Sequence, residues 1–449
     1  MRVCVVGLGK IGLPLAVQYA SRGHRVVGAD ISPEVVRLVG EGREPFPGEA
    51  GLDVALKRAV TEGLLTATVD TAAAAAAADA VVIVVPLLVD GDGVPDFRAM
   101  DAATAAVARG LRVGTLVAYE TTLPVGTTRG RFAPMLAAGS GLAADEFSLV
   151  FSPERVLTGR VFADLRRYPK LVGGVDADSA RHGVAFYQAV LDFDEGVGVR
   201  DLGSAEAAEL AKLAETTYRD VNIALANQFA RYADTLGVDV EQVIDACNTQ
   251  PYSHIHRPGI AVGGHCIPVY PRMYLWNDPG ATVVRSAREA NEGMPGYAVE
   301  RLAAAYGETC GASLTGARVL VLGAAYRGGV KETACSGVFP TVAALRARGA
   351  VPTVADPLYS DAELTALGLT PHRAGAPADA VIVQADHVEY ASLCPADLPG
   401  VRVLVDGRRV TDPERWRAPG VARVVLGAGA GAGAGAGVGA GVGAGAGVA

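Results

Sequence analysis

The feature that most constrains the fold is a glycine triplet directly after an apolar run at the start of the chain. Val3–Val6 has the composition of a buried strand, and Gly7, Gly9 and Gly12 follow it with the spacing G-x-G-x-x-G. The next residues have helical character, and a second apolar run ends in Asp30. This order of strand, glycine turn, helix, strand and acidic residue predicts a Rossmann-type dinucleotide-binding unit.

Each residue type in this turn has a physical role. The first glycine permits a tight turn, the second lets the backbone approach a pyrophosphate, and the third lets helix and strand pack closely. The Asp30 carboxylate can accept hydrogen bonds from ribose hydroxyls and repels a 2′-phosphate, so we predict NAD rather than NADP. Lys10 and Ile11 complete the predicted turn, although Lys10 could equally be solvated. A Rossmann unit that binds nothing is the alternative.

Composition excludes several classes of protein. The chain has 449 residues and a formal net charge of −8, which argues against a general nucleic-acid binder or a binder of anionic membranes. Apart from a Gly-Ala tail, it contains no long uncharged apolar segment. The six cysteines show no C-x-x-C pair, so neither a metal site nor a dithiol motif is predicted. With no leader pattern at the start, we expect a cytoplasmic protein with reduced thiols.

Two α/β patterns with a helical segment between them predict the domain organisation. Near-continuous apolar runs, typical of parallel strands buried on both faces, occur at Val3–Val6, Arg25–Ala29, Val81–Val85, Thr115–Tyr119, Leu149–Phe151 and Leu171–Val172. A run without Pro or Gly then extends from Ser204, a plausible N-cap, to about Leu236. Four more strand-like runs follow at Val319–Leu322, Val351–Ala355, Ala380–Val383 and Val401–Val405.

These patterns predict the fold class α/β, with two Rossmann-like doubly wound domains joined by a long central helix and a helical domain. We expect an NAD-binding domain over residues 1–202 and a central helical and dimerisation domain over 203–303. A second, smaller α/β domain is expected over 304–426, followed by a disordered Gly/Ala tail over 427–449.

Two further residues are candidates for chemistry. Cys266 lies in the segment Pro258-Gly-Ile-Ala-Val-Gly-Gly-His-Cys-Ile-Pro268, where glycines allow close approach of a ligand and prolines stiffen the backbone. Its neighbour His265 could lower the thiol pKa, or serve a structural role. Lys212 lies within the long helical run, where a lysine alone is most often a solvated surface residue.

Together these residues resemble the UDP-glucose/GDP-mannose dehydrogenase family of nucleotide-sugar 6-dehydrogenases. Five motifs in order carry the resemblance, which extends to about residue 425: Gly7–Pro14, Thr121–Thr127, Ser152–Leu157, Ala211–Leu213 through Tyr218–Asn222, and Gly263–Pro268. Such enzymes oxidise a sugar C6 alcohol to a carboxylate in two steps that use two NAD. The resemblance implies that residues 304–426 form the nucleotide-sugar (UDP)-binding domain.

The resemblance implies a role for individual residues. Cys266 would add as a thiolate to the intermediate aldehyde, so that the second oxidation gives a thioester. Lys212 would stabilise developing oxyanions, Glu154 and Thr122 would organise water and substrate, and Thr216 would stand where the family usually has Asn. Pro86 and Thr122 join the predicted cofactor site. The implied substrate-binding residues are Arg155, Val156, Leu157, Lys212, Arg257, Gly263, Tyr326 and Arg327. A homodimer through the central helix is expected.

The chain departs from the family pattern at several positions. Four residues after the cysteine the family usually has Asp, but this chain has Tyr270, and a phenol cannot replace a carboxylate base at neutral pH. The Phe-Lys segment of the C-terminal domain reads Tyr326-Arg327, a later family Arg is Ala334, and an Arg that reaches the neighbouring subunit's sugar is replaced around Tyr252. Substrate recognition is therefore less determined than reaction type.

The substrate remains open at the level of sequence. The Ser152–Leu157 and Gly263–Pro268 motifs resemble the branch that acts on UDP-N-acetylmannosamine or UDP-N-acetylglucosamine, and Thr158 stands where the glucose branch more often has an acidic residue. UDP-glucose or dTDP-glucose is the alternative. Alternatives from other classes are a two-electron β-hydroxyacid dehydrogenase and a non-catalytic nucleotide-sugar-binding protein.

Overall fold

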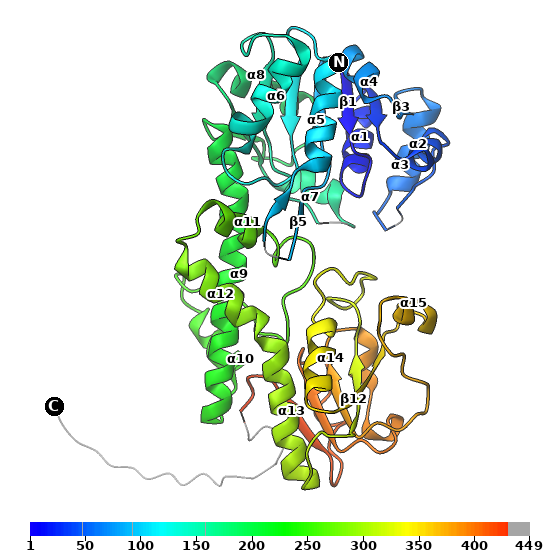
Figure 1. Ribbon diagram of the computed structural model, residues 1–449, viewed down its shortest axis with the longest axis vertical. Helices are drawn as coiled ribbons and strands as arrows, with labels where there is room; N and C mark the ends of the chain where they lie inside the picture. Colours follow the sequence, from blue (N-terminus) through cyan, green and yellow to red (C-terminus); the bar gives the residue numbers. More distant parts are fainter. Residues whose placement is uncertain (47, 92, 158, 430–449) are drawn as a thin grey trace, which may run out of the picture. The chain divides into compact units, whose positions relative to one another are not determined.

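The structure is a computed structural model that describes residues 1–429 except 47, 92 and 158 (Figure 1). The chain forms two compact units. The first comprises Met1–Thr217 and Val269–Gly280, and the second comprises Tyr218–Pro268 and the residues from Ala281 onward. Most of the predicted Gly/Ala tail lies outside the described residues. Within the described ranges, every helix is too short or too polar to cross a membrane.

The first unit is built on an eight-stranded sheet with the order β10-β9-β8-β7-β4-β1-β2-β3. Its strands are β1 (Arg2–Val6), β2 (Arg25–Ala29), β3 (Leu65–Thr68), β4 (Ala80–Ile83), β7 (Leu116–Tyr119), β8 (Ser148–Phe151), β9 (Lys170–Gly174) and β10 (Val199–Asp201). The chain adds β2 and β3 on one side of β1 and the later strands on the other, which is the doubly wound arrangement predicted from the sequence.

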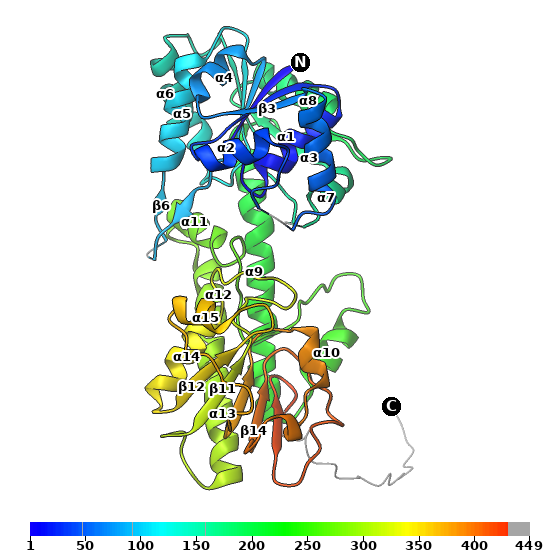
Figure 2. The same ribbon diagram turned by 90° about the vertical axis from the view of Figure 1, so that its right-hand side faces the viewer.

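Helices cover both faces of this sheet (Figure 2). One face carries α1 (Gly12–Ser21), α2 (Pro33–Gly40), α3 (Leu52–Thr61), α7 (Val161–Arg167) and α8 (Ala177–Val190). The other carries α4 (Thr71–Ala77), α5 (Arg98–Gly110), the π-helical turn η1 (Thr128–Phe132) and α6 (Ala133–Ser140). Alternate β1 residues enter opposite cores: Val3 and Val5 face the first set, whereas Cys4 and Val6 face the second. A short hairpin, β5 (Leu88–Val89) with β6 (Pro95–Asp96), completes the unit together with α11 (Tyr270–Asn277).

The expectation that all these strands are parallel is wrong for β9. It pairs antiparallel with β8, with Val150 opposite Gly174. The segment between them, which contains the 7-residue helix α7, leaves and returns at the same edge, so β9 starts where β8 ends. Lys170, the first residue of β9, therefore lies at the same edge as the residues that follow β8. The edge strands β3 and β10 have exposed polar residues and were not predicted.

The predicted long helix is α9, which runs for 32 residues over Ala205–Leu236. The Ser204 hydroxyl oxygen accepts a hydrogen bond from the Ala207 N–H at 3.2 Å, as expected of an N-cap. The compact units part within α9, between Thr217 and Tyr218. The division into three domains and a tail stays a prediction.

The second unit contains a five-stranded parallel sheet with the order β12-β11-β13-β14-β15. Its strands are β11 (Arg318–Leu322), β12 (Val351–Ala355), β13 (Ala380–Val383), β14 (Val403–Asp406) and β15 (Ala422–Val425). Its helices are the later part of α9, α10 (Val240–Cys247), α12 (Thr282–Glu292), α13 (Met294–Cys310), α14 (Val338–Ala347), α15 (Asp361–Ala366) and two short 3₁₀ turns, η2 (Val388–Ser392) and η3 (Pro395–Asp397). Helices α13 and α14 pack on one face, and Tyr390 and Trp416 on the other.

Candidate active site

The predicted cofactor residues lie along one edge of the first sheet. Gly7 follows β1, Asp30 follows β2, Pro86 lies just after β4, and Thr122 lies just after β7. These four strands are adjacent and parallel, so their carboxyl ends meet at the same edge. The direction of strand addition reverses between β1 and β4, the place where doubly wound sheets bind ligands.

The glycine turn meets the steric requirements of a dinucleotide site. Gly7 has φ +93°, a conformation that favours glycine, and a Cβ on Gly12 would lie 1.9 Å from the carbonyl oxygen of Gly7. In contrast, a Cβ on Gly9 would meet no protein atom within 4 Å, so the backbone there is open to a ligand. The N-cap residue of α1, Ile11, has no side-chain acceptor for the first-turn N–H groups, which suits an anion.

The Asp30 carboxylate is oriented by the backbone around it. One oxygen accepts a hydrogen bond from the Leu8 N–H at 2.8 Å, and the other accepts one from the Ser32 N–H at 2.9 Å. Each oxygen retains a lone pair for a ribose hydroxyl. The neighbouring Ile31 is 94% exposed and apolar, so it offers no charge to a 2′-phosphate. This geometry fits NAD.

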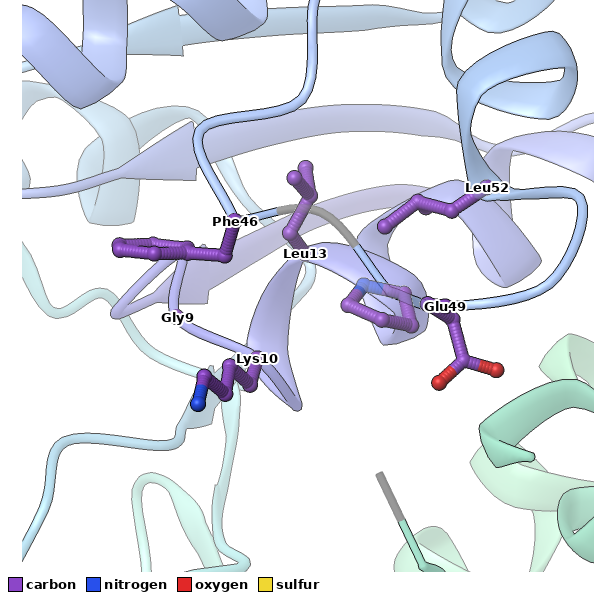
Figure 3. A pocket seen from close by; sticks show the side chains of 7 residues that line it. Gly9, Lys10, Leu13, Phe46, Glu49 and Leu52 are labelled. Atoms are coloured by element: carbon purple, nitrogen blue, oxygen red, sulfur yellow. The ribbon is translucent and has the colours of Figure 1, made fainter. Parts of the chain in front are cut away.

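A small hollow lies beside the glycine turn (Figure 3). It is lined by Gly9, Lys10, Leu13, Pro14, Phe46, Glu49 and Leu52. The Glu49 carboxylate accepts hydrogen bonds from the N–H groups of Gly159 at 2.6 Å and Val161 at 2.7 Å, and burial raises its pKa. Glu49 thereby ties the start of α7 to the wall of the hollow.

Glu154 lies further along the same edge, after β8. Its carboxylate is 12% exposed and contacts the Lys170 ammonium at 3.0 Å. Lys170 also contacts Glu120, the residue that follows β7, at 2.7 Å. Neither Lys170 nor Glu120 was predicted as a site residue. A lysine in a chain with only five is the one signal that could have drawn attention to it.

Lys212 is buried on α9 and faces an aromatic ring. Its ammonium lies 5.9 Å from the ring centroid of Tyr270, within cation–π distance. The Thr216 hydroxyl donates to the carbonyl oxygen of Lys212 at 2.9 Å, so its proton is engaged by the helix itself. One turn earlier on α9, the buried Glu209 carboxylate accepts a hydrogen bond from the Gly126 N–H at 2.6 Å. It also accepts hydrogen bonds from the N–H of Thr128 at 2.8 Å and from the Thr128 hydroxyl at 2.6 Å. Burial raises the Glu209 pKa to about 7.

Arg155 joins the Glu154 segment to α9. Its guanidinium forms two hydrogen bonds with the Glu215 carboxylate, at 2.9 and 3.3 Å, and its backbone N–H donates to Glu154 Oε1 at 2.8 Å. Val156 packs against the core on the sheet face that carries α1, α2, α3, α7 and α8, whereas Leu157 is 60% exposed.

Cys266 belongs to the second unit, where it is an exposed free thiol. Two residues earlier, Gly264 has φ +92° and donates its N–H to the carbonyl oxygen of Ala334 at 2.8 Å. A Cβ on Gly263 would lie 2.5 Å from the Cβ of Tyr326, so only glycine fits there. The structure thus brings the predicted residues Gly263, Cys266 and Tyr326 together within this unit.

Arg408, which the sequence pattern did not indicate, clamps this loop. The guanidinium is buried, which lowers its pKa, and it donates to the carbonyl oxygens of Gln384 at 3.0 Å, Tyr326 at 3.1 Å and Ala261 at 3.3 Å. It therefore links the strand ends of the second sheet to the loop that carries Cys266. An Asp-Gly-Arg-Arg sequence directly at the end of a predicted strand was the available signal.

Two predicted substrate residues are exposed arginines with partners of their own. Arg327 donates to the Tyr326 hydroxyl at 3.0 Å. Arg257 pairs with the carboxylate of Asp245 on α10. His265, beside the cysteine, lies 3.3 Å from Glu332. Each of these contacts lies within the second unit.

Comparison with known families decides the identity of the chain. Models of the UDP-glucose/GDP-mannose dehydrogenase family match it in three parts: the NAD binding domain at residues 1–191, the central domain at 206–293 and the UDP binding domain at 320–413. The chain belongs to this family. It is therefore an NAD-dependent nucleotide-sugar dehydrogenase, as the sequence resemblance implied.

Individual members of the UDP-glucose/GDP-mannose dehydrogenase family match almost the whole chain. The UDP-N-acetyl-D-mannosamine dehydrogenase of Pyrococcus horikoshii is 35% identical over 421 residues, which cover 91% of this chain and 96% of that protein. The enzyme of the same name from Methanocaldococcus jannaschii is 31% identical, with 95% and 97% covered.

Solved structures give the same picture. The UDP-D-ManNAc dehydrogenase of Pyrococcus horikoshii matches with a TM-score of 0.85 at 33% identity, covering 95% of this chain and 99% of that one. A UDP-glucose dehydrogenase from Pyrobaculum islandicum matches with a TM-score of 0.82 at 29% identity, covering 95% and 97%. The fold and the family are therefore confirmed, while the role of each site residue stays a prediction.

We expect Asp30→Ala to weaken NAD binding by about 10- to 100-fold, because charge-assisted hydrogen bonds to the ribose are lost. The ratio of NADP to NAD affinity should rise, since the repelling carboxylate is gone. Titration calorimetry with both dinucleotides measures this. Asp53→Ala, at an exposed position of α3, is the matched control. Unchanged NAD affinity in Asp30→Ala would reject the ribose role.

Proposed function

We propose that this dehydrogenase oxidises the C6 alcohol of a UDP-N-acetylhexosamine, with an N-acetylmannosamine or N-acetylglucosamine sugar, to the uronic acid. The observation that carries the proposal is the near full-length similarity to enzymes named UDP-N-acetyl-D-mannosamine dehydrogenase. The match of residues 320–413 to a UDP binding domain supports the uridine nucleotide.

The exposed thiol supports a four-electron course. Bound NAD supplies a hydride acceptor, and loss of hydride and proton from the alcohol gives an aldehyde. The Cys266 thiolate then adds to the aldehyde carbon, because a further hydride leaves only from a tetrahedral adduct. Transfer of that hydride to a second NAD, which would replace the first NADH, gives a thioester, and water cleaves it to the carboxylate and the free thiol. Cys266 is accessible for this chemistry on its glycine-lined loop.

The first unit supplies groups suited to the remaining roles. We assign stabilisation of the oxyanions to the Lys212 ammonium, because its compact positive charge suits an oxygen that becomes negatively charged during the reaction. Glu154 is assigned the orientation of water and Thr122 the positioning of substrate near C6. The cation–π contact between Lys212 and Tyr270 offers a physical account of the departure at 270: the ring holds the ammonium electrostatically where a carboxylate is absent.

UDP-glucose and dTDP-glucose are the alternative substrates, since a UDP-glucose dehydrogenase also matches over most of the chain. The two-electron β-hydroxyacid reading is not favoured, because the family match includes a UDP binding domain for which that activity has no use.

The proposed reaction is tested by measuring NADH formation over a panel of UDP-, dTDP- and GDP-sugars. We expect the highest kcat/KM with a UDP-N-acetylhexosamine and two NADH for each sugar consumed. A single NADH with accumulating aldehyde would remove the four-electron course, and preference for a glucose nucleotide would correct the substrate.

Substitution of the cysteine tests the thioester step. Cys266→Ser should lower full turnover by at least about 100-fold, because an alcohol is a far weaker nucleophile than a thiolate, whereas NAD affinity should be unchanged. Cys247→Ser, on α10, is the matched control. Wild-type turnover in Cys266→Ser would rule out the thioester mechanism.

A homodimer through α9 is also proposed. The exposed side chains of Tyr218, Leu225, Phe229, Tyr232 and Leu236 repeat at intervals of 7, 4, 3 and 4 residues, which places them on one helix face. A large apolar face of this kind is typical of protein interfaces.

We expect a Leu225→Glu, Tyr232→Glu variant to dissociate to monomers, because two charges would be buried at the interface. Sedimentation measures the molecular mass, and Val283→Glu, at an exposed position on α12, is the control. An unchanged dimer in the first variant, or a monomeric wild type, would contradict the proposal.

A cytoplasmic location is proposed on chemical grounds. The mechanism requires Cys266 reduced, and all six cysteines are free thiols. Cell fractionation tests it: recovery of the protein outside the cytoplasm with its thiols oxidised would contradict it.

A further inference from the structure

Lys170 is the centre of a buried ionic cluster at the sheet edge. Its ammonium, 4% exposed, contacts one oxygen of Glu120 at 2.7 Å and one oxygen of Glu154 at 3.0 Å. It also lies 4.8 Å from the ring centroid of Tyr187. Three strands converge to make this contact: Glu120 follows β7, Glu154 follows β8, and Lys170 begins the antiparallel β9.

Glu120, the most deeply buried residue of the cluster, is also held by hydrogen bonds on the side away from Lys170. The other Glu120 oxygen accepts hydrogen bonds from the hydroxyls of Tyr187 on α8, at 2.7 Å, and Tyr19 on α1, at 3.2 Å. The Glu120 side chain is fully buried. The side chain of Glu154 is the most exposed of the three, at 12%. The cluster therefore runs from a fixed interior end to a carboxylate at the surface of the site.

The balance of charge in the cluster favours one proton shared between the carboxyls. Two carboxylates and one ammonium would leave a net negative charge in a buried place, which is unfavourable. Burial raises the pKa of Glu120 to about 7 despite the Lys170 charge. Burial also acts against ionised Glu154, but Lys170 and hydrogen bonds outweigh it and hold the Glu154 pKa below its ordinary value.

Nothing in the proposed mechanism uses Lys170 or Glu120 directly. We propose that Lys170 and Glu120 are positioning residues that set the charge of Glu154: the ammonium holds Glu154 as the carboxylate, and Glu120 takes up the proton of the pair. This inference rests on the role assigned to Glu154 in the proposed function. It explains why a lysine is buried in a chain whose basic residues are nearly all arginine, since a compact ammonium fits between two carboxylates.

The titratable groups that face Glu154 come from separate elements. They are Lys170 from β9, Glu120 from the end of β7, and, behind Glu120, the hydroxyls of Tyr19 and Tyr187. The neighbouring Arg155 directs its guanidinium to Glu215 and offers Glu154 its backbone N–H. Removal of the cation should therefore raise the pH at which Glu154 takes up a proton, whereas removal of the second carboxyl, which already carries its proton there, should leave that pH nearly unchanged.

The test is the pH dependence of kcat and kcat/KM in the full-length enzyme, with the UDP-sugar that gives the highest rate. In Lys170→Met the acid limb should move to higher pH by about one unit or more, because two carboxyls then share the site without a cation. In Glu120→Gln it should stay within about half a unit of the wild-type position, because Glu120 already carries a proton at the pH where Glu154 titrates. The double variant should keep the raised limb of Lys170→Met, because it also lacks the cation.

Matched controls separate this effect from damage to the fold. Lys57→Met and Glu62→Gln, at exposed positions of α3 and its end, should leave the acid limb in place. NAD affinity and melting temperature are measured for every variant. If Lys170→Met does not fold, Glu120→Gln and the double variant carry the test, because neither leaves two buried carboxylates without a cation.

Infrared titration of protonated carboxyl groups gives a readout that needs no turnover. Glu120 and Glu209 should both give carboxyl signals that titrate near pH 7 in the wild type, and Glu120→Gln should lose one of the two signals. An acid limb that stays in place in Lys170→Met, or that moves to higher pH in Glu120→Gln, would overturn the inference, as would persistence of the limb in Glu154→Gln. None of these outcomes touches the proposed reaction, which is judged by NADH stoichiometry in the wild type.

Discussion

The contact between Gly12 and the carbonyl of Gly7 is the constraint on which the first unit depends. A Cβ at Gly12 would lie 1.9 Å from that oxygen, so helix α1 can start against the end of β1 only because the residue is glycine. This close packing brings the open backbone of Gly9 and the carboxylate of Asp30 to the same sheet edge. The predicted position of the dinucleotide thus depends on the absence of one side-chain atom.

Buried and half-buried acidic side chains organise the rest of the predicted site. Asp30, Glu49 and Glu209 each accept backbone N–H groups from loops that leave the sheet edge. Glu120 acts instead on a side chain, Lys170. Each of these carboxylates satisfies donors that would otherwise be buried without partners, which is costly. The loops therefore have defined positions without forming regular structure.

Local patterns were sufficient to predict most of the fold. The apolar runs at β1, β2, β11 and β13 are nearly continuous because those strands are buried on both faces, and such runs are readable in sequence. Edge strands β3 and β10 lack this signal because water covers part of them. The direction of β9 depends on its pairing with β8 across a long connection, which periodicity does not encode.

The candidate site likewise contains residues that the sequence indicated and residues that it did not. The glycines and Asp30 are recognisable by their spacing within one short segment, and Lys212 and Cys266 by the motifs that resemble the family. Lys170, Glu120 and Arg408 act across long sequence separations, and nothing near them in the chain announces a partner. The sequence by itself determined the family, the cofactor and the glycine turn. Only the tertiary structure decided which buried charges meet, because ion pairs depend on distances in space that folding creates.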